Sequence, residues 1–254
     1  MMRRVGLVMM LAAVLASTGC STVDDGGLTR DRVVVDGENT VGVVDADVTT
    51  RGVVVYFHGL DEDESILEKD DPHRSLVRDL TDAGYAVVAS RAGGNAFGNN
   101  ASQLNYAELA TWAADRYRVS DVFFLAESMG AIAAMNLLAK DPDLRPRGLA
   151  AIGPALNFDQ APADYRTSIA DANPDPAAVD PMQLPVESLS GSNIRFYVSP
   201  SDTLVPTSAN ADAFRARFGG VADISIVECT GPHLDPSCLQ GEDVVTWFNG
   251  LTRW

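Results

Sequence analysis

The stretch FFLAESMGAI, Phe123 to Ile132, places a serine between an apolar run and a glycine. The residues before the serine, DVFFLA (121–126), form the short and continuous apolar pattern of a strand that is buried on both faces. The residues after it, MGAIAAMNLLAK (129–140), predict a helix. Ser128 therefore lies in a tight turn, where its hydroxyl is held above the sheet and beside the free N–H groups of the helix.

Two explanations of Ser128 remain open at this point. Serine is favoured as the capping residue of a helix, and the local sequence fits that role. The other explanation is nucleophilic attack. A serine hydroxyl is too weakly acidic to attack an acyl group unaided, so an imidazole must accept its proton and a carboxylate must orient the imidazole. A histidine and a carboxylate placed to contact Ser128 would favour the second explanation over the first.

Apolar runs alternate with amphipathic segments along the rest of the chain. A pair of antiparallel strands is predicted first, at Arg32 to Val35 and Val41 to Asp45, around a turn-rich connection. Six further strands are predicted at 53–57, 85–90, 121–126, 148–153, 194–199 and 223–228. The 254 residues are consistent with one domain. The expected fold is α/β, with a mostly parallel eight-stranded sheet covered by helices on both faces.

The segment from Pro154 to Gly191 interrupts this alternation. It has no strong hydrophobic period and contains six of the thirteen prolines. Residues 154–191 are therefore predicted as a short, lid-like excursion over the upper edge of the sheet. Such a segment forms either a lid or pocket wall, or only an irregular loop.

Candidate partners of Ser128 follow two other predicted strands. His233 lies after the last strand, in ECTGPHLDPSC, and Asp202 lies just past a strand end, in IRFYVSPSDTLVP. Ligands of parallel sheets bind beyond the carboxyl ends of the strands, where all three residues are expected. Each also has a simpler explanation, as a loop histidine and a turn or capping aspartate. The other two histidines are His58, after VVVYF, and His73, in the polar approach to a helix.

Four motifs together resemble serine hydrolases of the α/β-hydrolase superfamily. They are YFHGL (56–60), AESMG (126–130), SPSDTLVP (199–206) and GPHLD (231–235), which span most of the chain from about Arg32 onward. The order serine, aspartate, histidine is the one expected of that superfamily. The sequence departs from the usual nucleophile pentapeptide at Ala126, where the first glycine is expected.

The resemblance implies a role for each site residue. Ser128 is the nucleophile, His233 shuttles the proton and Asp202 orients His233. The backbone N–H groups of Leu60 and Met129 form the oxyanion hole. His58 then has a structural role within its loop, and a catalytic His58 is the less favoured alternative. Two loops are candidates for shaping substrate choice, Ser90 to Asn100 and the acidic Asp61 to Ser65, although the second is more typical of a solvated face.

The N-terminus, MMRRVGLVMMLAAVLASTGC, predicts a signal peptide at residues 1–19. Its uncharged stretch, Val5 to Thr18, is shorter than the roughly 20 residues that cross a bilayer. The end of the segment resembles a bacterial lipoprotein signal, which implies lipidation of Cys20 and a membrane anchor, although Ser17 departs from that pattern. Residues 20–31 are then a flexible tether and 32–254 the folded domain. The expected location is the cell envelope, with a secreted soluble protein as the alternative.

The remaining cysteines, Cys229 and Cys238, are an even pair in an oxidising compartment if Cys20 carries lipid. A disulfide between them would enclose His233 and contribute about 2 to 3 kcal/mol by closing a short loop.

Charge and motifs exclude several classes of partner. The formal net charge is −16, and removal of residues 1–19 with their two arginines leaves about −18, which repels nucleic acid and anionic lipids. The sequence contains no CxxC, HExxH or phosphate-binding glycine loop, so no metal or cofactor is expected.

The sequence therefore predicts an exported serine hydrolase that cleaves an ester or related acyl bond in a small-molecule or lipid substrate. The alternatives are an acyltransferase or peptidase with the same three residues, and a non-catalytic binding protein on the same scaffold.

Overall fold

The computed structural model describes residues 20–23, 27–141 and 144–252. The predicted signal peptide, residues 1–19, lies outside the described residues. Among the helices in the described part of the chain, none is long and apolar enough to span a bilayer.

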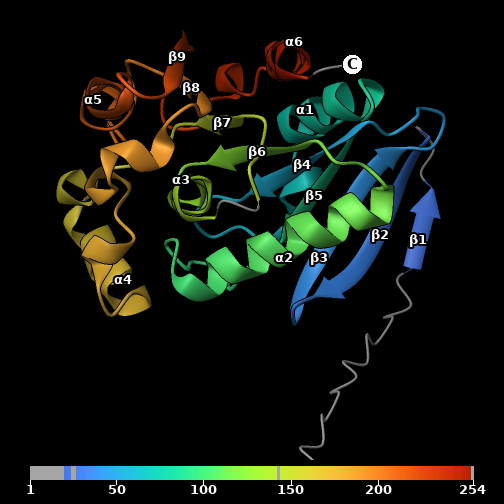
Figure 1. The fold of residues 1–254 in the computed structure, drawn as a ribbon, viewed down its shortest axis with the longest axis horizontal. Helices are drawn as coiled ribbons and strands as arrows, with labels where there is room; N and C mark the ends of the chain where they lie inside the picture. The colour runs from blue at the N-terminus through green and yellow to red at the C-terminus, as the bar shows by residue number, and fades with distance from the viewer. Residues whose placement is uncertain (1–19, 24–26, 142–143, 253–254) are drawn as a thin grey trace, which may run out of the picture.

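A single mixed sheet organises the molecule (Figure 1). Its strand order is β1-β2-β3-β5-β4-β6-β7-β8-β9, with β1 to β3 antiparallel and β4 to β9 parallel to one another. All eight predicted strands are present. The strands are β1 (Cys20–Val23), β2 (Leu28–Val35), β3 (Glu38–Asp45), β4 (Gly52–Phe57), β5 (Tyr85–Ser90), β6 (Val122–Glu127), β7 (Leu149–Ile152), β8 (Asn193–Val198) and β9 (Asp223–Glu228).

Helices cover both faces of the sheet, as the sequence predicts. The α-helices are α1 (Asp71–Asp82), α2 (Asn100–Tyr117), α3 (Gly130–Lys140), α4 (Ala163–Ala172), α5 (Ala211–Phe218) and α6 (Gly241–Leu251). Short 3-10 helices are η1 (Glu64–Glu68), η2 (Phe158–Gln160), η3 (Pro176–Ala178), η4 (Pro181–Gln183), η5 (Val186–Leu189), η6 (Thr207–Ala209) and η7 (Pro236–Cys238). Figure 1 shows α1 and α6 together on one side of the sheet, and α2 and α3 on the other.

The alternation of side chains along β6 explains these two layers. Phe123 and Leu125 belong to the apolar core under α1 and α6. Phe124 and Ala126 belong to the core under α2, α3 and α5. Every residue of β6 is buried, because a central parallel strand is covered on both faces.

The N-terminal edge of the sheet corrects the predicted domain boundary. The sequence predicts a flexible tether at residues 20–31, but Cys20–Val23 forms β1 and β2 already begins at Leu28. The backbone of β1 pairs with β2 from Cys20 opposite Arg32 to Val23 opposite Thr29. An edge strand such as β2 presents unpaired N–H and C=O groups, which β1 satisfies. The sheet therefore has nine strands, one more than the sequence predicts.

The excursion at 154–191 is an ordered wall that contains α4 and four short 3-10 helices. Hydrogen bonds from side-chain amides connect it to the rest of the domain. Asn136 of α3 donates to the carbonyl of Val179 at 2.8 Å, and Asn173 donates to the carbonyl of Phe97 at 3.2 Å. The segment is therefore held from both α3 and the loop after β5, and it is not an irregular loop.

Candidate active site

Ser128 occupies a tight turn between β6 and α3, in the left-handed region of backbone space with φ of 45°. Its N–H donates to the carbonyl of Ile152 at 3.0 Å. A Cβ built on Gly130 would lie 2.3 Å from the carbonyl oxygen of Phe57, so only glycine fits there. A non-glycine residue at positive φ carries backbone strain, which typically persists where the surrounding structure and a function require it.

The side chain of Ser128 does not cap α3. Its Oγ lies 2.8 Å from Nε2 of His233, and Nδ1 of His233 lies 2.6 Å from Oδ2 of Asp202. The structure thus brings together the three residues that the sequence singles out, each from a loop that follows its own strand, β6, β8 and β9.

Asp202 fixes the tautomer of His233. Its side chain is buried, and its Oδ1 accepts hydrogen bonds from the N–H groups of Leu204 at 2.9 Å and Val205 at 2.8 Å. Oδ2 faces His233 at 2.6 Å, and a carboxylate oxygen can only accept. The proton of the neutral imidazole is therefore on Nδ1, and Nε2 is free to accept the hydroxyl proton of Ser128.

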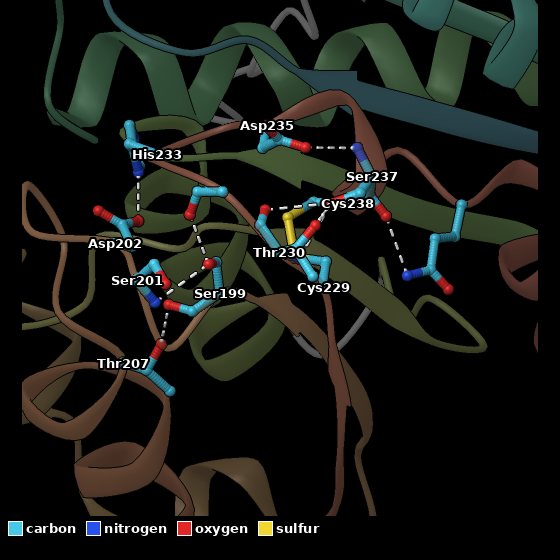
Figure 2. Close-up of a disulfide and its surroundings, with 12 residues drawn as sticks. Ser199, Ser201, Asp202, Thr207, Cys229, Thr230, His233, Asp235, Ser237 and Cys238 are labelled. Carbon is cyan, nitrogen blue, oxygen red and sulfur yellow. Dashed lines mark hydrogen bonds and ion pairs between the residues drawn. A yellow bond between two sulfur atoms is a disulfide. The ribbon is translucent and has the colours of Figure 1, made fainter.

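The loop that carries His233 is braced at several points (Figure 2). The Cys229–Cys238 disulfide closes it, as the sequence predicts. Ser199 donates to the carbonyl of Gly231 at 2.6 Å, and Thr207 donates to the carbonyl of Ser199 at 2.9 Å. Ser199 thus links the loop of Asp202 to the loop of His233. The SPSD motif contains Ser199, but the sequence alone does not indicate this role, because the bond to Gly231 spans 32 residues.

Reduction of the disulfide tests how far this brace supports His233. We expect a Cys229→Ser/Cys238→Ser variant to lose about 2 to 3 kcal/mol of stability, because the unfolded chain gains conformational freedom. That loss corresponds to a melting temperature lower by about 4 to 12 °C in a domain of this size. The measurement is thermal unfolding with and without a thiol reductant. The melting temperature of the variant should not change further on addition of reductant. An unchanged melting temperature in both the variant and the reduced wild-type protein would contradict the expectation.

The loop after β4 lies beside Ser128. A Cβ built on Gly59 would be 3.8 Å from the Cβ of Ser128. The N–H groups of Leu60 and Met129 have no acceptor within the described residues, and both residues line the same cavity as Ser128. The two N–H groups are therefore available as hydrogen-bond donors to a molecule bound beside Ser128, which keeps the predicted oxyanion hole a candidate.

His58 and the acidic loop have structural contacts. Both ring nitrogens of His58 lie against backbone carbonyls, of Gly59 at 2.8 Å and Arg91 at 2.9 Å, and the side chain is buried. His58 is therefore not placed to act as a base. In the acidic loop, the Asp63 side chain accepts from the N–H of Ser65 at 2.8 Å, and these hydrogen bonds to Ser65 lower the pKa of Asp63.

An apolar cavity of about 280 Å³ opens at Ser128. Its walls come from the loop after β4, the loop after β5, α3 and the excursion. The apolar side chains that line it include Leu60, Phe97, Met129, Ile132, Phe158 and Ile169. Phe97 belongs to the glycine-rich loop Ser90 to Asn100, so that loop does contribute to the pocket. Among the described residues, no group of three or more His, Cys, Asp or Glu side chains could hold a metal ion.

Similarity to solved structures identifies the fold. No protein family and no curated protein matches this chain. The esterase Pf2001 of Pyrococcus furiosus is similar in structure, with a TM-score of 0.62 and 17% identity over 96% of this chain and 94% of that one. Est1E of Butyrivibrio proteoclasticus has a TM-score of 0.63 and 14% identity, over 87% and 96%. The S-formylglutathione hydrolase of Staphylococcus aureus has a TM-score of 0.62 and 14% identity, over 89% and 99%. The chain has the α/β-hydrolase fold.

Proposed function

We propose that this chain is a serine hydrolase that cleaves carboxylic esters through an acyl-enzyme on Ser128. The observation that carries the proposal is the hydrogen-bonded row from Ser128 through His233 to Asp202, which ends at the mouth of an apolar cavity. A capping role for Ser128 accounts for none of these contacts. The similar folds of two esterases support the proposal.

The geometry supports a two-step reaction. Ser128 Oγ attacks the ester carbonyl carbon while its proton passes to Nε2 of His233, and the charge of Asp202 stabilises the imidazolium that forms. The carbonyl oxygen becomes an oxyanion between the N–H groups of Leu60 and Met129. When the intermediate collapses, the alcohol leaves with the proton from His233. A water molecule then loses a proton to His233, attacks the acyl-enzyme, and releases the acid with Ser128 restored.

The cavity indicates the size of the acyl group. A volume of about 280 Å³ lies at the lower end of the range for small-molecule pockets. The lining is mostly apolar, so burial of an apolar chain is favourable. We infer that the substrates are esters of short and medium acyl chains, and that longer chains exceed the cavity.

A fluorophosphonate probe tests the proposal directly, because it reacts with an activated serine. We expect the purified protein to be labelled on Ser128, with the site located by peptide mass spectrometry, and the Ser128→Ala variant to remain unlabelled. A panel of p-nitrophenyl esters should then show activity on short and medium chains that falls for longer ones. An unlabelled wild-type protein would indicate a binding protein on a hydrolase scaffold. Transfer of the acyl group to added alcohols or amines would indicate an acyltransferase.

We also propose that the protein is exported and anchored by lipid on Cys20. The N-terminal sequence supports this, through its two arginines, its short apolar stretch and the small residues before Cys20. Because β1 begins at Cys20, such an anchor would hold the domain without an intervening tether. Mass spectrometry of the N-terminal peptide from cell membranes tests this, with a Cys20→Ala variant recovered in the soluble fraction as the control.

A further inference from the structure

Glu127, the residue before Ser128, is a carboxylate in the core of the protein. Its side chain is fully buried, at 0% exposure. It follows Leu125 on β6 and therefore points to the face covered by α1 and α6, away from α3. A buried carboxylate is costly unless it is paired and hydrogen-bonded, so its partners need an explanation.

The partners of Glu127 form a buried row. Tyr56 of β4 donates its hydroxyl proton to Oε1 of Glu127. His73 of α1 donates from Nε2 to the same oxygen at 3.1 Å. Nδ1 of His73 donates to Oδ1 of Asp70 at 2.6 Å, and Asp70 also caps α1 by accepting from the N–H of His73. We refer to Asp70, His73, Glu127 and Tyr56 as the buried row.

The contacts of His73 favour its protonated, positively charged form. Both of its ring nitrogens face a carboxylate, and a neutral imidazole has only one N–H to donate. Burial works against the charged form, but the hydrogen bonds and negative charges of Glu127 and Asp70 outweigh it and raise the pKa of His73. The imidazolium thus ties the strand end beside Ser128 to the first turn of α1.

The loop after β4, which carries the predicted oxyanion residue Leu60 and which we call the oxyanion loop, is attached to the segment around His73. The N–H of Gly59 donates to Oε2 of Glu62 at 2.9 Å, and Lys69 forms an ion pair with Oε1 of Glu62. Lys69 directly precedes Asp70 in the chain. The segment Lys69 to His73 is therefore connected to the nucleophile turn through Glu127 and to the oxyanion loop through Glu62.

We propose that Glu127 and its buried row are positioning groups that set the distance between Ser128 Oγ and the oxyanion-hole N–H groups. This inference rests on the proposed function. Glu127 is one peptide bond from a serine held at a strained φ of 45°, so a displaced Glu127 would release that strain by moving Ser128. Within the described part of the chain, Oε2 of Glu127 has no hydrogen-bond partner. The fold thus tolerates a buried carboxylate with one unsatisfied oxygen at this position, and an apolar side chain would have been less costly for packing alone.

A Glu127→Gln variant tests the proposal, because it keeps the shape and removes the charge that holds His73. We expect kcat on the best p-nitrophenyl ester to fall about 10- to 100-fold, because small misplacements of reacting groups slow catalysis by such factors. The KM should change less than about threefold. The rate of fluorophosphonate labelling should fall with kcat. Tyr56→Phe removes one donor from the row with little change in packing and should lower both rates by a smaller factor. This variant tests the proposal if Glu127→Gln does not fold.

Tyr85→Phe is the matched control. It removes a tyrosine hydroxyl on the same face of the sheet, bonded to Asn249 at 2.8 Å, at the opposite end of the strands. It should lower thermal stability and leave kcat unchanged. If Glu127→Gln and Tyr56→Phe also affect only stability, the buried row is structural and the inference is overturned. Absence of labelling in the wild-type protein would overturn the proposed function itself, and this inference with it.

Discussion

Replacing Ser128 by alanine should lower esterase kcat by about 10⁶-fold, the effect typical of losing the nucleophile of a hydrogen-bonded triad. His233 Nε2 is directed at Ser128 Oγ at 2.8 Å, so Ser128 is the hydroxyl from which this base can take a proton. The measurement is steady-state hydrolysis of the preferred p-nitrophenyl ester.

Ser188→Ala is a suitable control for Ser128→Ala. Ser188 is a serine of the excursion whose hydroxyl donates to the carbonyl of Pro185 at 2.7 Å, away from the cavity lining. Its activity should equal that of the wild type. Activity of Ser128→Ala within about tenfold of the wild type would show that Ser128 is not the nucleophile.

The second large effect is expected from Asp202→Asn, which should lower kcat by about 10⁴-fold. Two backbone N–H groups, of Leu204 and Val205, already occupy Oδ1 of Asp202. In the variant, the amide oxygen keeps these bonds and the NH₂ group faces His233. The imidazole must then accept at Nδ1 and carry its proton on Nε2, where it can no longer accept the proton of Ser128.

The tautomer itself can be observed in the Asp202→Asn variant. The ¹⁵N chemical shifts of His233 distinguish a protonated Nδ1 from a protonated Nε2. Asp235→Asn is the control, because Asp235 lies in the same loop but its side chain accepts from Ser237 N–H at 3.0 Å. It should retain both activity and tautomer. An unchanged His233 tautomer in Asp202→Asn would contradict the role assigned to Asp202.

The residues of the candidate site were predictable because each follows a strand of a parallel sheet. Parallel strands bring their carboxyl ends to one edge, so the position of Ser128, Asp202 and His233 after separate apolar runs implied that they meet. The pattern of strands could be predicted for the same reason, since buried parallel strands have continuous apolar runs.

Features that depend on distant contacts were not predictable. The pairing of Cys20–Val23 with β2 was missed because a glycine- and aspartate-rich segment is typical of a linker, and only the open edge of β2 makes it a strand. Helix α4 was missed because only Ile169 of its residues is buried, which leaves no apolar period to detect. The contact of His73 with Glu127 joins residues 54 positions apart, beyond any local pattern.

The attachment of the excursion has a kinetic consequence. Its bonds to Asn136 and to the carbonyl of Phe97 hold the cavity wall in one place, with Asn173 buried at the junction. A wall held in this way does not need to open at the surface of a lipid droplet or micelle before substrate enters. We therefore expect the enzyme to act on single dissolved ester molecules, with a rate that saturates smoothly and does not jump when the substrate begins to form a separate phase.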